Sequence, residues 1–240
     1  MCLDYVVILA KLPAQKINSF KSSESATIFP LSRSAIGLIA AHCYDSTMKK
    51  SKISISAPKP EKEAPALFDK TIALVGLMGS GKTLIGRRLA EQLGLTFADS
   101  DQLVTKMAGV SITDIFELAG EAKFRDMEFR AIQTQLDKPP HVLATGGGAF
   151  CEPETASLLS KNAIVVWLQA SPDTLLKRIG DTTSRPILQT GPPLEILQQL
   201  QTARARFYRK ANIHINTDGL TTPRSLATLI STLDSYRAKQ

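Results

Sequence analysis

The sequence predicts an α/β fold in which helices cover both faces of a parallel sheet. From residue 68 onward, short apolar runs of strand length alternate with longer segments of helical periodicity, which is the pattern of parallel-sheet proteins. Glycine or proline ends several of these segments, as expected of turns. The chain of 240 residues is 43% hydrophobic and 21% charged, a composition typical of one globular domain with an appended segment.

Each predicted element follows from a local pattern. The apolar run 71–75 predicts a buried strand, and 84–93 has apolar residues at helical spacing before Gly94, a common helix stop. By the same criteria the predicted strands are 71–75, 95–98, 141–144, 163–168 and 212–215, and the predicted helices are 84–93, 111–118, 124–136, 171–176, 194–209 and 223–238. Residues 181–193 are rich in Thr, Pro and Gly and show no periodicity, which predicts a loop.

Residues 1–66 differ from the rest. They lack sustained periodicity, and their Lys-, Pro- and Glu-rich stretch 57–65 reads as a disordered linker. We expect 1–66 to be a disordered or mis-annotated extension, Met48 to be the natural start, and 67–240 to form the folded domain. A transit peptide is the alternative, although five acidic residues weaken it.

The net charge of +7 raises the question of nucleic-acid binding. Residues 1–66 hold 9 Lys/Arg and 5 Asp/Glu, which leaves 20 basic and 17 acidic residues in the domain. Aromatic residues make up only 6% of the chain, so we expect no nucleic-acid partner. Cys2, Cys43 and Cys151 form no CxxC pair, which argues against structural zinc and suits a reducing compartment. No apolar stretch approaches the roughly 20 residues of a membrane span.

The segment Gly76–Thr83, Gly-Leu-Met-Gly-Ser-Gly-Lys-Thr, joins a predicted strand to a predicted helix. This is the context of a phosphate-binding loop, in which backbone N–H groups and the helix N-terminus surround phosphate oxygens. Lys82 can reach the β- and γ-phosphates, and the Thr83 hydroxyl can bind Mg²⁺. The alternative is a glycine turn before a helix. The candidate nucleotide-binding residues here are Gly79, Ser80, Gly81, Lys82, Thr83 and Leu84.

Two further polar segments follow predicted strands. Ligands bind at the carboxyl ends of parallel strands, and Asp99 and Asp101 follow one such strand while the glycines 146–148 follow another. Because alternate residues of an extended segment point the same way, we expect both carboxylates in one site. One can support the metal and the other can orient a substrate hydroxyl. The alternative is a pair of turn-forming aspartates that cap the next helix.

Several arginines have both functional and ordinary interpretations. Arg125 and Glu128 share a helix face, where a plain ion pair is the ordinary interpretation. Arg185, before Pro186 in the loop 181–193, can close on a γ-phosphate or remain a solvated side chain. Arg204, on the predicted helix 194–209, can lie on an exposed charged face.

Together these segments resemble shikimate kinases. The resemblance spans about 68–220 and is carried by the phosphate loop, Asp99-x-Asp101, Gly120-Glu-x-x-Phe-Arg125-x-x-Glu128, the glycines 146–148, Arg185-Pro186 and Arg204-x-x-x-Tyr208. It implies a three-layer P-loop kinase fold, like that of nucleoside monophosphate kinases, with a five-stranded parallel sheet. It also implies a substrate-binding helical segment at about 99–129 and a lid at about 181–195, both mobile.

The resemblance implies transfer of the ATP γ-phosphoryl group to the 3-hydroxyl of shikimate, in the pathway to chorismate and the aromatic amino acids, with Mg²⁺. Arg204 is chosen over Arg206 because it lies four residues before Tyr208. The implied catalytic residues are Lys82, Asp101 and Arg185. The implied shikimate-binding residues are Asp101, Arg125, Gly146, Gly147, Gly148 and Arg204; Arg178 and Arg185 are implied to bind ATP, with Arg178 stacked on adenine, and Thr83 and Asp99 to bind the metal.

Two alternatives stay open: a gluconate-type small-molecule kinase on the same fold, and an inactive ATP-binding regulatory module. Intact Lys82, Asp99 and Asp101 argue against the second. We expect a monomer with no membrane partner, located in the bacterial cytosol, with a plastid as the alternative.

Overall fold

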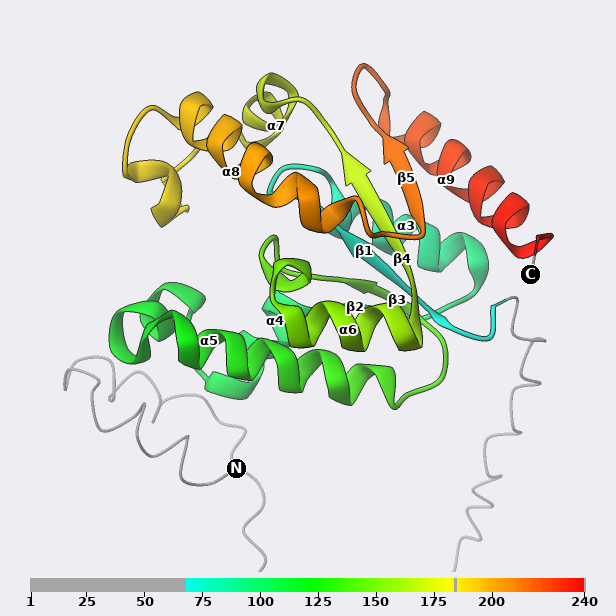
Figure 1. Cartoon of the computed structure of the whole chain (residues 1–240), viewed down its shortest axis with the longest axis horizontal. Coiled ribbons are helices and arrows are strands. Elements are labelled where there is room, and N and C mark those ends of the chain that lie inside the picture. The colour runs from blue at the N-terminus through cyan, green and yellow to red at the C-terminus, as the bar shows by residue number, and fades with distance from the viewer. Residues whose placement is uncertain (1–67, 184, 240) are drawn as a thin grey trace, which may run out of the picture. The chain divides into compact units, whose positions relative to one another are not determined.

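The computed structural model describes residues 68–183 and 185–239. These form one five-stranded sheet in the order β2-β3-β1-β4-β5 (Figure 1), and every strand pair is parallel. The strands are β1 Thr71–Val75, β2 Phe97–Asp99, β3 Val142–Ala144, β4 Ala163–Gln169 and β5 Ile213–Asn216. The predicted α/β fold and its five parallel strands are confirmed. Our expectations for residues 1–66 lie outside the described residues.

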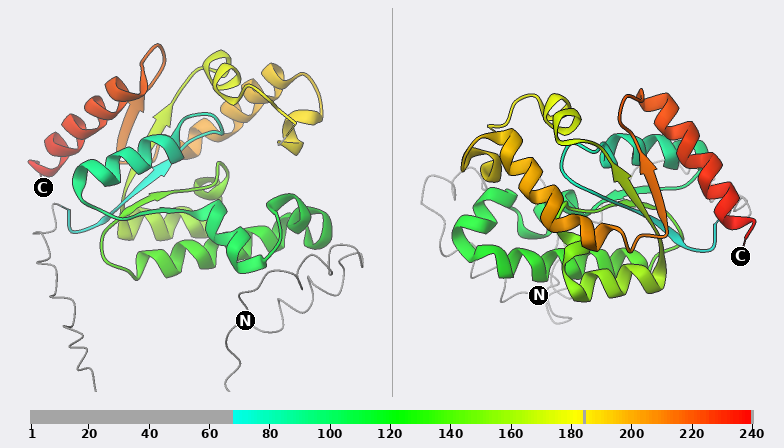
Figure 2. Two further views of the ribbon diagram at one scale, coloured as in Figure 1. Left: turned by 180° about the vertical axis from the view of Figure 1, so that it is seen from behind. Right: turned by 45° about the horizontal axis from the view of Figure 1, so that its top comes forward.

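Helices cover both faces of the sheet (Figures 1 and 2). One face carries α3 Lys82–Leu93 and α9 Thr222–Arg237; the other carries α5 Ile112–Leu136, α6 Pro153–Asn162 and α8 Pro193–Tyr208, with α7 Pro172–Ile179 packed against α8. The side chains of β1 illustrate this arrangement, because alternate residues pack into hydrophobic cores on opposite faces of the sheet. Ile72 and Leu74 pack with α3 and α9, whereas Ala73 and Val75 pack with α5, α6 and α8. A strand buried on both faces therefore reads as a continuous apolar run.

The segment between β2 and β3 has its own small core. Helix α4 Ser100–Ala108 packs against α5 through Val104, Ala108, Ile115 and Phe124. The expected helix start at residue 111 is confirmed, since Ser111 and Asp114 form a capping box at the beginning of α5. The two predicted helices within α5 meet at Gly120, whose φ of 80° and ψ of 172° interrupt the helical backbone. Only glycine adopts this conformation readily.

Some details differ from the sequence prediction. The second strand lies at 97–99 rather than 95–98, and helices α4 and α6 were not predicted. Helix α6 buries only Thr155 and Leu159, so its apolar pattern is too sparse to show periodicity. Within the loop 181–193, residues 186–189 form a short 3-10 helix, η2 Pro186–Gln189. No helix among the described residues has the length and apolar character needed to cross a bilayer.

Candidate functional site

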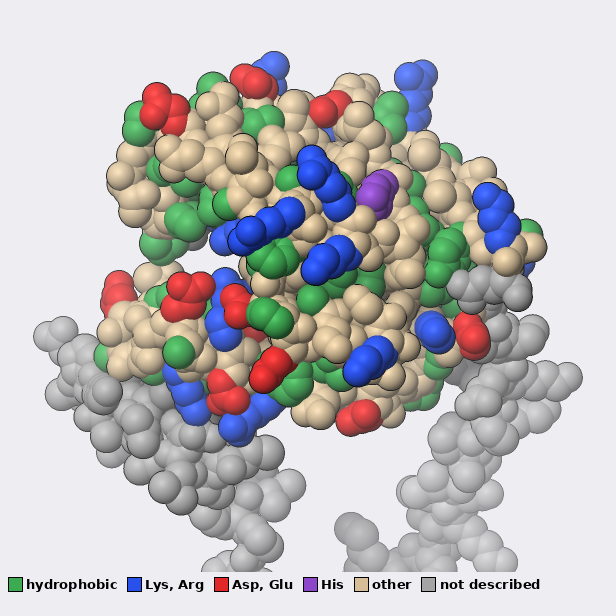
Figure 3. Space-filling view, viewed as in Figure 1, with side chains coloured by type: hydrophobic (Ala, Val, Ile, Leu, Met, Phe, Trp, Pro, Cys, Tyr) green, Lys and Arg blue, Asp and Glu red, His purple; other side chains and the backbone are tan. Residues whose placement is uncertain are grey.

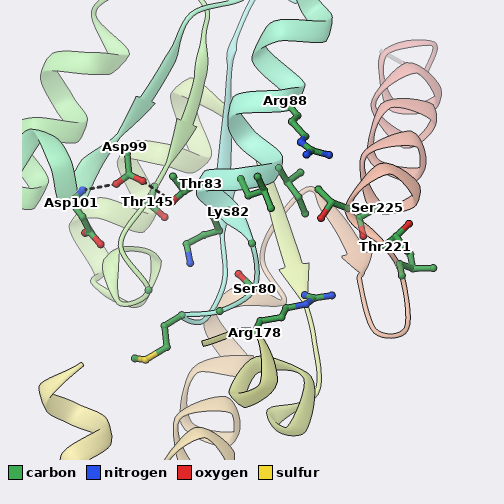
Figure 4. Close-up of a pocket in the computed structure, with 18 of the residues that line it drawn as sticks. Ser80, Lys82, Thr83, Arg88, Asp99, Asp101, Thr145, Arg178, Thr221 and Ser225 are labelled. Atoms are coloured by element: carbon green, nitrogen blue, oxygen red, sulfur yellow. Dashed lines mark hydrogen bonds between the residues drawn. The ribbon is translucent and has the colours of Figure 1, made fainter. Parts of the chain in front are cut away.

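A cavity of about 970 Å³ opens at the carboxyl ends of β1, β2 and β3 (Figure 4), where open α/β sheets bind ligands. The loop after β1 and helix α3 contribute Met78–Ile85 and Arg88 to its lining, and the end of β2 and the start of α4 contribute Asp99 and Asp101. The other lining residues are Thr145 and Gly147 after β3, Arg178, Arg185, and Leu220–Pro223 with Ser225. The structure thus brings together both aspartates, the phosphate loop and the two arginines that the sequence analysis assigned to the nucleotide.

The phosphate loop, Gly76–Thr83, curves around its own lysine. Gly79 and Gly81 have φ values of 77° and 91°, and a side chain at Gly79 would lie 2.8 Å from the Leu175 carbonyl oxygen. The Lys82 Nζ donates hydrogen bonds to the carbonyl oxygens of Gly76 and Leu77, at 2.8 and 2.9 Å. No side chain caps the N-terminus of α3, so its first N–H groups face the cavity and favour an anion there.

Asp99 connects the loop to α4. The Thr83 hydroxyl donates to Asp99 Oδ2 at 2.8 Å, and Asp99 Oδ1 accepts from the Asp101 backbone N–H at 3.1 Å (Figure 4). Asp99 is therefore the N-cap of α4, and Asp101 lies in the first helical turn. Our expectation that both residues lie on an extended segment is wrong, because the strand ends at Asp99. The helical turn nevertheless leaves both residues lining the cavity.

Opposing charges meet around Lys82. Burial lowers the pKa of Lys82 to about 8, although Asp101 and Asp99 act in the opposite direction. Burial raises the pKa of Asp101, and Asp99 adds to this effect while Lys82 opposes it. The ammonium and the carboxylate therefore favour each other's charged forms in a partly desolvated site.

Beside the cavity lies an arginine cluster, which we define as Arg125, Glu128, the glycine run Gly146–Gly148 and Arg204. Arg125 donates to the buried Glu128 at 2.6 Å and to Glu121 at 3.1 Å, and Glu152 lies 3.7 Å away. Figure 3 shows Lys and Arg side chains at the inner end of a notch between the side of α5 and the side of η2. The helix ion pair that we considered as the ordinary interpretation of Arg125 is present.

Side chains of the protein itself occupy the space that larger residues would need in the glycine run. A side chain at Gly146 would collide with Glu128 Oε1 and lie 2.8 Å from Asp101 Oδ1, and one at Gly148 would collide with the Arg125 guanidinium. At Gly147 the nearest atom, Arg204 Nη1, would be 3.6 Å away. The run therefore lets Asp101, Glu128 and Arg125 approach the backbone after β3.

Glu128 is the acidic centre of the arginine cluster. Its side chain is 1% exposed, and burial raises its pKa to about 7 although Arg125 acts against this. Among the described residues, its Oε1 has no hydrogen-bond partner. The sequence analysis placed Glu128 in a motif and in a plain ion pair with Arg125 but gave it no functional role, because its nearness to Gly146 is a long-range contact.

Arg204 approaches the glycine run from α8. Its Nη1 donates to the Gly147 carbonyl oxygen at 3.1 Å, and the Tyr208 hydroxyl donates to the same oxygen. Arg206 is exposed and its guanidinium stacks over Phe207 at 4.7 Å. Arg204 thus lies against the glycine run, whereas Arg206 is exposed to solvent.

The remaining two arginines border the cavity on the side of α7. Arg178 is held by Thr217, whose hydroxyl and carbonyl oxygens accept hydrogen bonds of 2.9 and 2.8 Å. Arg185, immediately before η2, is exposed, yet it is close enough to Lys82 to contribute to the lowering of its pKa.

Comparison with known proteins agrees with this arrangement. The model of the shikimate kinase family matches residues 78–234. The shikimate kinase of Caulobacter vibrioides is 49% identical over 148 residues, covering 62% of this chain and 74% of that protein. The one from Ruegeria pomeroyi is 41% identical, covering 71% of this chain and 88% of that protein. The structure of Acinetobacter baumannii shikimate kinase in complex with shikimate aligns with a TM-score of 0.67 at 35% identity, over 69% of this chain and 93% of that one.

The chain belongs to the shikimate kinase family. It is therefore a kinase of the P-loop fold, and ATP is the phosphoryl donor of shikimate kinases. The family resemblance inferred from the sequence motifs is confirmed.

Some residues at the site of this shikimate kinase family member were not predicted from the sequence. The cavity also contains Arg88, Thr145, Thr221, Thr222, Pro223 and Ser225. These lie in α3, after β3, and at the start of α9, where no motif marks them. Thr145 was the most accessible to prediction, since it directly precedes the glycine run.

Proposed function

We propose that this chain transfers the γ-phosphoryl group of ATP to the 3-hydroxyl of shikimate, giving shikimate 3-phosphate and ADP. The observation that carries the proposal is that Asp101 lines the phosphate cavity and also lies against the glycine run of the arginine cluster. A hydroxyl acceptor whose carboxylate is bound by the arginines would thus present its hydroxyl next to Asp101 and the phosphate loop.

At the phosphate end, the loop supplies positive charge through its backbone N–H groups and Lys82. Backbone N–H groups of Gly79–Leu84 would bind the β-phosphate, and Lys82 would exchange its two carbonyl partners for phosphate oxygens. Such preorganised donors stabilise the charge of a phosphoryl-transfer transition state. Exchanging neutral carbonyls for anionic oxygens would also stabilise the charged form of Lys82, whose pKa burial has lowered.

Magnesium fits the pair Thr83 and Asp99. Their oxygens are 2.8 Å apart, and hydroxyl and carboxylate oxygens are the donors that Mg²⁺ prefers when phosphates supply the remaining ligands. When bound, the ion would offset charge on the β- and γ-phosphates.

At the acceptor end, Arg125 and Arg204 would bind the shikimate carboxylate, because guanidinium groups pair with carboxylates as two-pronged donors. Asp101 would accept a hydrogen bond from the 3-hydroxyl and orient its oxygen toward the γ-phosphate, and would take its proton as the new bond forms. The glycine run would line the ring. Arg178 would stack on adenine, and Arg185 would contact the γ-phosphate when the segment 181–195 closes, which would exclude water and limit ATP hydrolysis.

We further propose that residues 67–240 form a complete catalytic domain that acts as a monomer in the bacterial cytosol. Among the described residues, this chain itself supplies the phosphate loop, both aspartates and the lining arginines, so the roles proposed above require no residue from a second copy. Sedimentation at enzyme concentrations used for assay would show a single species of monomer mass; an activity that falls on dilution would contradict this.

The deciding experiment measures ADP release with MgATP and shikimate, gluconate or no acceptor. Shikimate-dependent turnover is the expected result. Turnover with gluconate would keep the fold and overturn the acceptor chemistry. ATP binding without turnover on either acceptor would instead favour a regulatory module.

A further inference from the structure

The cavity has a second end, away from Lys82, that the roles proposed above leave partly unused. It is bounded by Leu84 and Arg88 of α3, Arg178 of α7, and Leu220–Pro223 with Ser225 at the start of α9. Figure 4 shows Arg88 extending from α3 toward α9, on the side where Ser225 and Thr221 lie. The phosphates belong at the other end, beside Lys82 and Thr83, so this end faces the nucleoside half of a bound nucleotide.

The position of Arg88 along α3 places it near the nucleoside half of a bound nucleotide. It follows Thr83 by five residues, which is about 7.5 Å along a helix axis. Leu84, four residues before Arg88, shares its helix face, lines the same cavity and is 50% exposed. An apolar side chain and a guanidinium one turn apart thus form one wall of the nucleoside end.

The guanidinium of Arg88 has hydrogen-bond donors available for a ligand. Within residues 68–183 and 185–239 it has no ion pair or hydrogen bond, whereas Arg178 is fixed by Thr217. The acidic residues that line the cavity, Asp99 and Asp101, belong to the phosphate end. A guanidinium only donates hydrogen bonds, so its ligand there must offer acceptors. Ribose hydroxyl oxygens and purine ring nitrogens are such acceptors.

We propose that Arg88 is a nucleotide-binding residue that donates hydrogen bonds to acceptor atoms of the nucleoside half of ATP and ADP. The proposal rests on the use of ATP proposed above, and it adds a contact on the opposite wall from Arg178. Arg88 acts on affinity for the nucleoside half and not on the phosphoryl-transfer step.

The neighbouring Arg87 provides a matched control. It is also exposed and lies on the same helix, but its guanidinium stacks over Phe97 at 5.5 Å and it does not line the cavity. Arg87→Ala and Arg88→Ala remove the same charge at adjacent positions, so a general electrostatic effect would appear in both variants.

The test is calorimetric titration of the wild type, Arg88→Ala and Arg87→Ala with MgADP and with magnesium tripolyphosphate, which lacks a nucleoside. We expect Arg88→Ala to weaken ADP binding roughly tenfold, the usual effect of losing a hydrogen bond from a charged donor. Tripolyphosphate binding should stay within about twofold, and Arg87→Ala should change neither. Unchanged ADP affinity in Arg88→Ala, or an equal loss for both ligands, would overturn the proposal.

Two additions make the outcome specific. With 2′-deoxy-ADP, disappearance of the Arg88→Ala effect would identify the ribose 2′-hydroxyl as the acceptor, and persistence would assign the contact to another nucleoside atom. Arg88→Gln replaces Arg88→Ala if melting curves show that the alanine variant is unfolded. Because no shikimate is present, failure of this inference is distinguishable from failure of the proposed reaction, which the ADP-release assay tests separately.

Discussion

The phosphate loop consists of eight consecutive residues, whereas the arginine cluster draws on α5, α8 and the glycine run. The loop acts mainly through backbone N–H groups and one lysine, whose Nζ donates hydrogen bonds to two carbonyl oxygens of its own loop. The arginine cluster acts through side chains that hydrogen bonds fix in place. Arg125 donates to the Glu128 carboxylate, and Arg204 donates to the Gly147 carbonyl oxygen. The phosphate loop therefore depends on few residues outside itself, whereas the arginine cluster depends on contacts between segments that are distant in the sequence.

The largest expected effects belong to Lys82 of the phosphate loop and to Asp101, which lines the same cavity. Lys82→Ala and Asp101→Asn should each lower kcat by roughly 10³-fold or more, since each removes a group that faces the transferred phosphoryl. Thermal melting should show folded proteins, because Lys82 is partly desolvated and its loss relieves that cost. Turnover within tenfold of the wild type in either variant would contradict the proposed roles.

Next comes the arginine cluster itself. Arg125→Ala should raise the KM for shikimate on the order of 100-fold by removing a two-pronged carboxylate partner, with the KM for ATP little changed. Arg130→Ala is the matched control, because Arg130 is exposed on the same helix and pairs with Asp126 at 3.0 Å. An unchanged shikimate KM in Arg125→Ala would remove Arg125 from the carboxylate role.

A smaller effect separates neighbouring glycines. Gly148→Ala would displace the Arg125 guanidinium, whereas Gly147→Ala meets nothing closer than 3.6 Å. Arg125 is 18% exposed and can swing away, so Gly148→Ala should raise the shikimate KM roughly tenfold more than Gly147→Ala while costing about 1 kcal/mol of stability or less. Steady-state kinetics and urea unfolding measure the two quantities. Equal KM values for both variants would mean that the run does not position Arg125.

The two regions should also give opposite pH dependences of stability. The folded-state pKa of Glu128 is raised to about 7, so between about pH 4.5 and 7 the folded protein binds more protons than the unfolded chain, and the free energy of unfolding falls as pH rises. The pKa of Lys82 is lowered to about 8, so between about pH 8 and 10.5 the unfolded chain binds more protons, and stability rises with pH.

Urea unfolding at a series of pH values checks both trends. The free energy of unfolding should change by on the order of 1–3 kcal/mol across each pH range. Glu128→Gln should reduce the pH dependence of the unfolding free energy in the lower range, and Lys82→Met should reduce it in the upper range. Asp101, whose pKa is also raised, keeps some slope in the lower window. Identical curves for wild type and Glu128→Gln would contradict the assignment.

The smallest expected effect is that of the N-terminal segment. Deleting residues 1–47 should leave kcat and both KM values within about twofold, because the residues given a role in the proposed reaction all lie in the described part of the chain, from Gly79 onward. A truncated enzyme that lost activity would show that the segment contributes to catalysis and is not a false start.

The same contrast explains what the sequence could predict. The phosphate loop and the strands were predictable because each is marked by neighbouring residues: a glycine pattern, or an apolar run such as Thr71–Val75 buried on both faces. Helix α4 was not predicted, since of its nine residues only Ser100, Val104 and Ala108 are buried. Asp101 was therefore assigned to extended backbone although it lies in a helix.

The arginine cluster required more than local pattern. Arg125 and Arg204 were assigned through family resemblance, and nothing near them in the sequence shows that Glu128 meets Gly146 or that Tyr208 meets Gly147. Arg88 belongs to no motif that we recognised, because its position at the cavity depends on how α3 faces α9. Such contacts follow from the fold and not from spacing along the chain.

Gly120 divides α5 into two pieces by interrupting its helical backbone. A side chain at this position would meet no atom within 4 Å, so its positive φ, and not crowding, is the reason for glycine. Arg125 and Glu128 follow the break, on the piece that carries Ile132 into the main core, whereas Ile115 precedes it. Residues 112–119 therefore pack with α4, whereas the piece that carries Arg125 and Glu128 also reaches the main core through Ile132.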